Sequence, residues 1–466
     1  MNELTINLQT RSEVPLYEQI YQYMKREIQE GRIASGEKLP SSRSLSRHLE
    51  VSRSTVELAY EQLISEGYVE AVPCKGYFAA DLEGLYRLDA MPALSEPEAT
   101  AEEKEWKYDF TPNGVDLNSF PYGVWRRLAK DSLQDDRAQM FRLGDPQGEY
   151  GLRRAISHYL YQARGVNARP EQIIVGAGND YLLMLLSTVI GRDHKVALEN
   201  PTYKQAYRLF QRLSYNVCTV DMDEKGMEVT GLQASKADIA FVMPSHQYPL
   251  GIVMPMKRRM ELLGWAAEAP KRYIIEDDYD SEFRYKGKPI PALQGYDRWG
   301  KVIYIGTFSK SIAPSIRISY LVLPPMLLKE FQEKSSFLSC TVSRVDQLIL
   351  QRFLEEGHYE RHLNKIRTLY KGRHDTLIGC LKELQHHCTI SGEHAGVHIL
   401  LHFSEEVTEE ELIQKAAGKG VKVYGLSQYY IDTPGNKPTI LLGYANISEE
   451  KIKKAVTLLE EAWFSK

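Results

Sequence analysis

Lys310 stands in a segment whose residue types suit the covalent capture of a phosphate-bearing carbonyl compound. In IYIGTFSKSIAPSIRISYLV the lysine follows an apolar run and two hydroxyl residues, Thr307 and Ser309, and it precedes Arg317. A lysine amine forms a Schiff base with a carbonyl carbon. An arginine with nearby hydroxyl or backbone N–H donors is suited to binding phosphate. The segment therefore predicts a covalent attachment point at Lys310 with a phosphate site beside it.

Two upstream segments add groups that complete such a site. RYIIEDDYDSEF ends an apolar run in paired acids, and a carboxylate there can keep a pyridine nitrogen protonated so that the ring withdraws electrons. IIVGAGNDYLL has the form of a strand, a tight glycine turn and a helix start, which predicts a phosphate cradle at Gly178 and Asn179. The cofactor that combines these features is pyridoxal 5'-phosphate. Each segment alone is also compatible with a solvated lysine, a solvated strand end or an ordinary turn.

A second set of polar residues lies near the N-terminus, at the starts of two short predicted helices. LPSSRSLSRHLEVSRSTVELAYEQL places hydroxyl residues and arginines at both starts. Helix N-termini attract phosphate, and an arginine can bond guanine with both arms of its guanidinium. The first turn of the second helix of a helix-turn-helix reaches base edges in the major groove. The predicted DNA contacts are Ser41, Arg43, Ser52, Arg53, Ser54 and Thr55, together with Lys75 and Gly76 at the tip of a following hairpin.

The overall charge gives no separate support for DNA binding. The net charge is −4, and acidic residues slightly outnumber basic ones between Arg11 and Phe78. Affinity for DNA depends on the basic groups on the face that meets the phosphates rather than on the total charge of a domain. Ordinary helix caps and solvated arginines are the alternative interpretation of each residue taken alone.

Three helices and a hairpin must position these candidate DNA contacts. An apolar stripe over 15–30 predicts the first helix, and serine caps predict further helices from Ser41 and from Ser52, the last ending at Gly67. YVEAV and YFAA flank the turn PCKG, which predicts a β-hairpin. The pattern indicates a winged helix-turn-helix over 13–81.

The remainder of the chain has a different periodicity. Residues 82–107 are acidic, contain proline and alanine and lack periodicity, as expected of a linker. Beyond them, apolar runs such as KVALEN, IAFVMP and KVIYIGTFS alternate with helical stretches, which favours a mainly parallel sheet covered by helices. We therefore expect an α/β domain over 108–466, in which 332–466 forms a small α+β subdomain.

Composition limits the function classes. The 466 residues are 43% hydrophobic and 26% charged, which is typical of a globular protein with at least two domains. A membrane span needs roughly 18 consecutive apolar residues, and the sequence contains no such stretch. The N-terminus lacks a secretory signal pattern, and the five cysteines form no CxxC pair. We expect a cytoplasmic protein without a membrane partner, a disulfide framework or a metal site.

These segments resemble known families. Residues 15–78, including LPSSRSLSRHL and VSRSTVELAYEQLISEGYVE, resemble the GntR-type winged helix-turn-helix. The glycine, acid and lysine segments, in this order, resemble fold-type I aminotransferases of the aspartate aminotransferase superfamily. The combination, with PSHQYPLG and EDDYDSEFRY, is similar to MocR/GabR-type regulators. The resemblance implies a head-to-tail homodimer that binds a double-stranded DNA operator and responds to a small amine, an amino acid or the cofactor itself.

The resemblance also implies individual roles in the cofactor site. Lys310 would carry pyridoxal phosphate as a Schiff base. Asp277 would bond the pyridine nitrogen, and Tyr279 would face the phenolic oxygen. Tyr203, in the NPTY segment, would lie beside the ring.

Two departures from the aminotransferase pattern bear on catalysis, and a third residue differs from what a γ-aminobutyrate-responsive relative would have. Tyr248 stands where these enzymes usually have an asparagine before PxG, and Leu441 stands where they have an arginine that binds the substrate α-carboxylate. Gln205 offers no charge where a relative responsive to γ-aminobutyrate would have an arginine. Without a bidentate carboxylate contact an α-amino acid is poorly oriented. We therefore expect a ligand sensor with little or no turnover; the alternative is an active aminotransferase with an appended DNA-binding domain.

Overall fold

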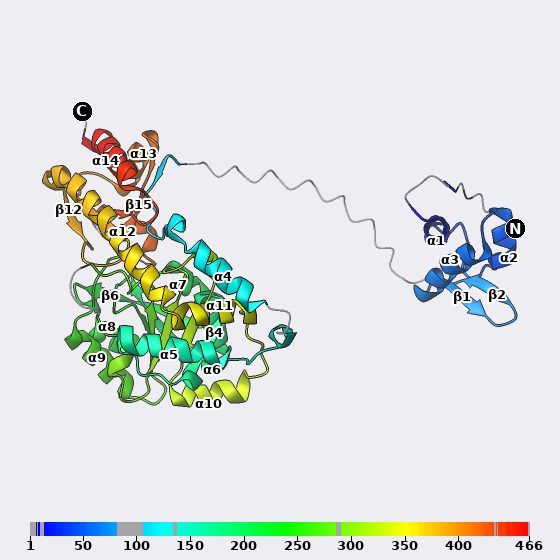
Figure 1. The fold of residues 1–466 in the computed structure, drawn as a ribbon, viewed down its shortest axis with the longest axis horizontal. Coiled ribbons are helices and arrows are strands. Elements are labelled where there is room, and N and C mark those ends of the chain that lie inside the picture. The colour runs from blue at the N-terminus through cyan, green and yellow to red at the C-terminus, as the bar shows by residue number, and fades with distance from the viewer. Residues whose placement is uncertain are drawn as a thin grey trace. The chain divides into compact units, whose positions relative to one another are not determined.

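The computed structural model forms two compact units, Met1–Glu103 and Lys104–Lys466, and each is described by itself (Figure 1). The predicted linker, apart from residues 106–107, and residue 13 of the predicted DNA-binding domain lie outside the described residues. The structure describes residues 6, 8–9, 14–81, 106–133, 138–285, 290–432, 435 and 437–464.

The N-terminal unit consists of the three predicted helices and the predicted hairpin. The helices are α1 (Leu16–Gln29), α2 (Ser42–His48) and α3 (Arg53–Ser65). Strands β1 (Val69–Val72) and β2 (Gly76–Ala79) pair antiparallel. The apolar faces meet in one buried core that includes Ile20, Met24, Leu45, Val56 and Leu63.

Serine caps fix where α2 and α3 begin. Ser41 Oγ accepts a hydrogen bond from the Ser44 backbone N–H at 3.2 Å, and Ser52 Oγ accepts one from the Thr55 N–H at 3.1 Å. Each bond satisfies a backbone donor that has no partner within the first helical turn. The predicted starts of both helices are therefore confirmed.

The second unit is built on an eight-stranded sheet in the described residues, with the order β4-β11-β10-β9-β8-β5-β6-β7. Neighbouring strands in the run from β10 to β6 pair parallel, whereas β11 is antiparallel to both of its neighbours. Strands β4, β8 and β10 are buried along their whole length, which explains their continuous apolar runs. The strands are β4 (Ile173–Gly176), β5 (Lys195–Asn200), β6 (Asn216–Asp223), β7 (Gly226–Met227), β8 (Ile239–Val242), β9 (Tyr273–Asp278), β10 (Val302–Thr307) and β11 (Ser319–Val322).

Helices cover both faces of this sheet. Apolar residues of α6 (Asn179–Ile190), α7 (Lys204–Arg212) and α10 (Pro325–Lys334) pack on one face. The other face is covered by α5 (Tyr150–Arg164), α8 (Val229–Ser235), α9 (Met256–Ala267) and α11 (Arg344–Glu355). Helices α4 (Tyr122–Ser132) and α12 (His358–Leu381) extend the same core toward the C-terminal part. The predicted α/β layering is confirmed.

The C-terminal part is the predicted α+β segment. Its antiparallel sheet has the order β12-β13-β16-β15, while β14 pairs with β3, which comes from the start of the unit. The strands are β3 (Tyr108–Asp109), β12 (Cys388–Ser391), β13 (His398–Phe403), β14 (Val421–Lys422), β15 (Tyr424–Gly425) and β16 (Thr439–Gly443), and the helices are α13 (Glu409–Gly418) and α14 (Glu449–Phe464). Short 3-10 turns lie at Leu117–Ser119, Ala138–Phe141, Pro170–Gln172, Gln294–Tyr296, Pro314–Ile316, Lys382–His386 and Leu426–Tyr429.

Among the described residues, no helix is both long enough and apolar enough to cross a bilayer.

Candidate cofactor site and DNA-binding face

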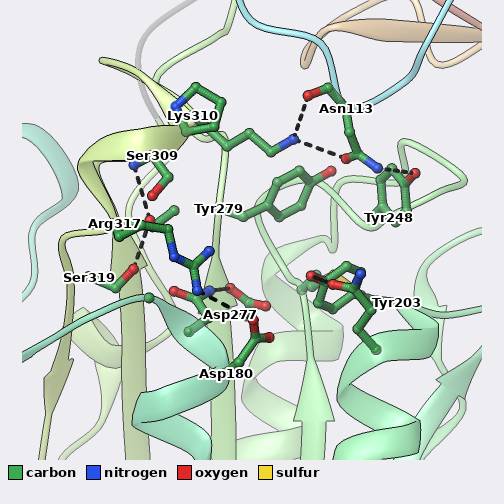
Figure 2. Close-up of a pocket in the computed structure, with 16 residues that line it drawn as sticks. Asn113, Asp180, Tyr203, Tyr248, Asp277, Tyr279, Ser309, Lys310, Arg317 and Ser319 are labelled. Atoms are coloured by element: carbon green, nitrogen blue, oxygen red, sulfur yellow. Dashed lines mark hydrogen bonds and ion pairs between the residues drawn. The ribbon is translucent and has the colours of Figure 1, made fainter. Parts of the chain in front are cut away.

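The predicted cofactor residues line one cavity of about 310 Å³ (Figure 2). It lies at the carboxyl ends of β9 and β10, which are neighbouring parallel strands and therefore end at the same edge of the sheet. Residues far apart in the sequence meet there. The predicted members of its wall are Gly178, Asn179, Tyr203, Asp277, Tyr279, Thr307, Ser309, Lys310 and Arg317.

Lys310 follows β10 and points its amine across the cavity (Figure 2). Its Nζ donates to the backbone oxygen and to Oδ1 of Asn113, at 3.0 Å each. Burial lowers the pKa of Lys310 to about 8, so about a tenth of the amine is uncharged at pH 7, far more than for an exposed lysine. An uncharged amine is the form that attacks a carbonyl carbon.

Asn113 was not predicted as a site residue. It lies in the loop after β3, far from Lys310 in sequence, and its Nδ2 donates to Tyr248 Oη at 3.1 Å. The segment TPNG that contains it reads as an ordinary turn. This side chain reaches the lysine only because the first residues of the second unit pack near the sheet.

The phosphate end of the cavity is formed around Arg317. Its guanidinium lies 3.5 Å from the Asp180 carboxylate and donates to the Ala177 oxygen at 3.3 Å. Gly178, the residue that caps α6, has φ +96°, and a Cβ there would lie 2.3 Å from Arg317 Nη2. Glycine is therefore required both by the backbone conformation and by the close approach of the guanidinium.

Two hydroxyl groups complete this end. Thr307 Oγ1 accepts from the Ser309 N–H at 3.1 Å and from Ser319 Oγ at 2.8 Å, so it shapes the turn that carries Lys310. The Ser309 hydroxyl is buried and has no hydrogen-bond partner among the described residues. Arg317 itself has a left-handed backbone, with φ +51°, a strain that concentrates at functional sites. The unpaired Ser309 hydroxyl and the Arg317 guanidinium are donors of the kind that a phosphate group requires.

Asp277 is the buried acid of the cavity and lies below the Arg317 guanidinium in Figure 2. It is 5% exposed and accepts from Asn179 Nδ2 at 3.2 Å. Burial, and next the nearby carboxylates, of which Asp278 is the strongest, raise the pKa of Asp277 to about 7. A protonated pyridine nitrogen placed against it would stabilise the ionised carboxylate. An amine, a phosphate cradle and a buried acid in one cavity fit pyridoxal phosphate.

Aromatic residues form the side walls. The ring centroids of Tyr248 lie 6.4 Å from those of Tyr203 and 5.9 Å from those of Tyr279, with the rings edge to face. Tyr248 Oη donates to Tyr429 Oη at 2.8 Å, and the Tyr203 hydroxyl donates to Gln205. Burial raises the pKa of all three wall tyrosines, so they stay neutral hydrogen-bonding groups.

Leu441, the residue at the expected carboxylate-binding position, is fully buried in β16. It packs with Leu400 and Leu426 in an apolar cluster that Tyr429 also contacts. An ionised carboxylate placed there would lose its hydration without gaining a partner.

The predicted DNA contacts lie mostly on the surface of α2, of α3 and of the β1–β2 hairpin, which we call the wing. Ser41 and Arg43 surround a shallow hollow together with Arg47. Arg53 is 64% exposed, and its Nε lies 2.7 Å from Glu57 Oε1 one helical turn later. Of the hydroxyl residues in the LPSSR segment, Ser42 is buried and donates to Glu57 at 3.2 Å, so it braces α2 against α3.

The remaining predicted contacts form two groups, one at the N-terminal cap of α3 and one at the tip of the wing. Ser52 Oγ lies 2.8 Å from Ser54 Oγ and 2.7 Å from Thr55 Oγ1, so the three hydroxyls share one hydrogen-bonded cluster at the start of α3. At the wing tip, Lys75 is exposed and Gly76 has φ +112°, which an L-residue side chain disfavours.

Comparison with known proteins identifies both units. Residues 16–78 match the model of the bacterial regulatory proteins of the gntR family, and residues 114–459 match that of aminotransferase class I and II. YdeL, an HTH-type transcriptional regulator of Bacillus subtilis, is 41% identical over 99% of both chains. The probable rhizopine catabolism regulatory protein MocR of Rhizobium meliloti is 31% identical over 97% of this chain and 95% of its own. The chain belongs to the MocR-type HTH transcriptional regulators.

Solved structures agree with this assignment for the second unit. An archaeal alanine:glyoxylate aminotransferase matches with a TM-score of 0.70 at 23% identity, over 78% of this chain and 92% of its own. A multiple substrate aminotransferase from Thermococcus profundus matches with a TM-score of 0.69 at 26% identity, over the same shares. This MocR-type regulator is thus a DNA-binding protein with a fold-type I aminotransferase-like domain. The predictions of fold, transcriptional regulation and pyridoxal phosphate as cofactor are confirmed.

Proposed function

We propose that this MocR-type regulator controls transcription by capturing a small ligand at Lys310 and transmitting its presence to the DNA-binding domain. The observation that carries the proposal is the environment of Lys310: an amine with lowered pKa, held by two oxygens of Asn113 in a cavity that also contains a phosphate cradle and a buried acid. The bound cofactor supplies an electrophilic carbonyl carbon. Lys310 would hold the cofactor at this carbon, Arg317 at its phosphate and Asp277 at its pyridine nitrogen.

A primary amine is the ligand class that this chemistry favours. Pyridoxal phosphate would supply a carbon that accepts primary amines, and Asn113 would hold the Lys310 amine through two acceptors whenever that amine is free. The ligand can shift the protein only by binding one conformation more tightly than the other. The phenols of Tyr203 and Tyr248 line the cavity, and Leu441, at the expected carboxylate-binding position, carries no charge, so an amine without a carboxylate suits the site better than an α-amino acid.

Two other functions are distinguishable from amine sensing. The cofactor itself is a candidate signal, because the pyridoxine biosynthesis regulator PdxR of Corynebacterium glutamicum is 29% identical over 99% of this chain. DNA affinity that changes with cofactor occupancy in the absence of any amine would support that function. The second is a genuine aminotransferase, for which steady formation of a keto acid from an amino acid is the expected observation.

The assembly and the domain limits belong to the same proposal. We propose a head-to-tail homodimer in the cytoplasm, with a DNA-binding domain over 13–81, a linker over 82–107 and a cofactor domain over 108–466. Large apolar side chains that a single chain leaves exposed, among them Leu143 at 87% and Phe337 at 81%, suit burial against a second copy. Sedimentation velocity and limited proteolysis would test the dimer and the boundaries.

The deciding experiment follows the visible absorbance of the purified protein. We expect a band near roughly 420 nm from the lysine-bound cofactor, because its imine would be conjugated with the pyridine ring. Borohydride should abolish the band and add the cofactor's mass at Lys310. Lys310→Ala should lose the band and the added mass, whereas Lys329→Ala, which removes an exposed lysine of α10, should keep both. A band that persists in Lys310→Ala would remove the assignment.

The same protein then serves to identify the ligand class. Tyramine and tyrosine differ only by a carboxylate, and so do phenethylamine and phenylalanine. Each compound is titrated while absorbance and DNA affinity are recorded. We expect the amine of each pair to change both signals at a lower concentration than the amino acid, and the opposite order would favour the aminotransferase function.

A further inference from the structure

A buried histidine lies behind the cofactor cavity, where neither the sequence motifs nor the proposed chemistry gave it a role. His246 follows β8, and its ring is 2% exposed. Its Nδ1 lies 2.9 Å from Asp280 Oδ2 and 3.0 Å from Tyr279 Oη. Asp280 is 1% exposed and follows Tyr279 directly in sequence, so all three groups meet at the end of β9.

The hydrogen bonds define what each group does. An ionised carboxylate only accepts hydrogen bonds, so Asp280 holds the His246 proton on Nδ1 and fixes the tautomer and the orientation of the ring. The Tyr279 hydroxyl lies beside both partners. The pair therefore sets the direction in which the Tyr279 phenol points, and that phenol forms part of the cavity wall.

The other side of the His246 ring contacts the C-terminal subdomain. A Cβ added to Gly396 would lie 2.0 Å from His246 Cε1, so the ring lies directly against that backbone. Gly396 is held in turn, because its N–H donates to the Phe283 oxygen at 2.7 Å and its oxygen accepts from Tyr444 Oη at 2.9 Å. The ring of His398, on β13, lies 5.6 Å from that of His246.

We propose that His246 is a positioning residue that couples the C-terminal subdomain to Tyr279, and through Tyr279 to the cofactor ring. The proposal rests on the proposed function in one respect, namely that Tyr279 faces the bound cofactor. A shift of the Gly396 backbone displaces the His246 ring, because a close-packed interior transmits displacement and leaves an aromatic ring no free space. The ring then carries the Tyr279 phenol with it.

Two further observations support a function beyond packing. His246 Nε2 and His398 Nδ1 are buried, and neither has a hydrogen-bond partner among the described residues, an arrangement that simple apolar packing would avoid. The titratable and charged groups around the His246 ring are Asp280 and Tyr279 from the β9 end and His398 from β13. Arg164, which is paired with Asp278, and Arg284 line the same small cavity.

The test uses the full-length protein loaded with pyridoxal phosphate and measures the pH midpoint of its visible absorbance change. His246→Asn keeps a donor close to the position of Nδ1, whereas His246→Gln places its donor near Nε2. We expect His246→Gln to shift the midpoint by about one pH unit, which corresponds to a tenfold change in the protonation equilibrium. His246→Asn should stay near the native midpoint.

A glycine pair tests the link to the C-terminal subdomain. Gly396→Ala pushes a methyl group into the His246 ring and should shift the midpoint in the same way. Gly392→Ala is the matched control, because Gly392 has the same left-handed backbone, φ +75° against +77°, but its added Cβ meets Leu400 instead. The control should leave the midpoint unchanged.

The outcomes are separable from those of the proposed function. Borohydride labelling at Lys310 in each variant shows whether the cofactor is bound, and a wild-type protein without that label would contradict the proposed function itself. The role of His246 is overturned if labelled His246→Gln and Gly396→Ala both keep the native midpoint, or if Gly392→Ala shifts it as far as Gly396→Ala. If His246→Gln does not fold, the glycine pair alone decides.

Discussion

The pKa of the Lys310 amine is set by burial more than by any single charged neighbour. Desolvation lowers the pKa of its amine to about 8, and the negative charge of Asp280 only partly opposes this. An exposed lysine would be almost fully protonated at neutral pH. The structure therefore assigns the nucleophilicity of the residue to the cavity that encloses it.

This leads to a pH prediction for cofactor uptake. Below the pKa the amine is protonated and cannot attack, so the rate of pyridoxal phosphate uptake by the cofactor-free protein should rise about tenfold per pH unit up to about pH 8 and level off above it. Stopped-flow absorbance between pH 6 and 10 measures this rate. A rate that continues to rise up to pH 10 would show that Lys310 keeps its ordinary pKa.

Arg53 is the residue of α3 best placed for a base contact, since its side chain extends from the first turn into solvent. Arg53→Ala should weaken specific DNA binding by about 1 to 3 kcal/mol if the guanidinium forms a bidentate contact with guanine. Arg26→Ala is the control, because Arg26 is also exposed but lies on α1 and is not among the predicted DNA contacts. Fluorescence anisotropy with a selected operator measures both, and an equal effect of the two variants would make Arg53 an ordinary phosphate or surface arginine.

The sequence could indicate a residue of the site only where a side chain suited to the chemistry stands at the end of a recognisable apolar strand. Lys310 and Gly178 follow apolar strands and Asp277 lies near the end of one, so these positions could be predicted and the sheet brings them together. Asn113 and His246 could not be found in this way, because their roles come from contacts with segments distant in sequence. The sequence contains the residues, but only tertiary packing selects their partners.

At the level of elements, strands with continuous apolar runs were predicted, whereas β6 and β11 were not. The apolar runs of β4, β5, β8, β9 and β10 mark them directly. In contrast, β6 alternates threonine and aspartate with apolar residues, and β11 has only four residues and runs antiparallel to both neighbours. Their places in the sheet depend on pairing between strands rather than on local pattern.

Glu199 in β5 gives an element-scale prediction about stability. The side chain is fully buried, and burial raises its pKa to about 8. In the unfolded chain the carboxyl ionises near pH 4.5, so the folded state holds the proton more tightly and loses stability as the pH rises from about 4.5 through about 8. Glu199→Gln removes that loss.

The expected result is a difference that depends on pH. Glu199→Gln should melt several degrees higher than the wild type at pH 9 and at nearly the same temperature at pH 5, on the order of a few kcal/mol of stability at the higher pH. Thermal unfolding followed by circular dichroism at both pH values measures this. A variant that is equally destabilised at both pH values would mean that the carboxyl is held by specific hydrogen bonds rather than tolerated as a neutral acid.

At the scale of the whole molecule, a DNA-binding unit and a cofactor unit can form one regulator only if binding at one changes binding at the other. Thermodynamic linkage makes this coupling reciprocal: a factor by which the cofactor changes DNA affinity is the factor by which DNA changes cofactor affinity. A tenfold effect corresponds to about 1.4 kcal/mol. The two directions can be measured independently, which makes the coupling testable before any effector is identified.

We therefore expect DNA selected by the cofactor-loaded protein to bind the cofactor-free protein with a different affinity, and saturating DNA to change the cofactor affinity by the same factor. Anisotropy measures the first quantity and a visible absorbance titration the second. In Arg53→Ala, a DNA concentration that just saturates the wild type no longer saturates the protein, so it should change cofactor affinity less, while cofactor affinity without DNA should equal that of the wild type. Identical DNA affinity with and without cofactor, and with a panel of amines, would mean that the two units act independently and that cofactor chemistry at Lys310 serves a purpose other than transcriptional control.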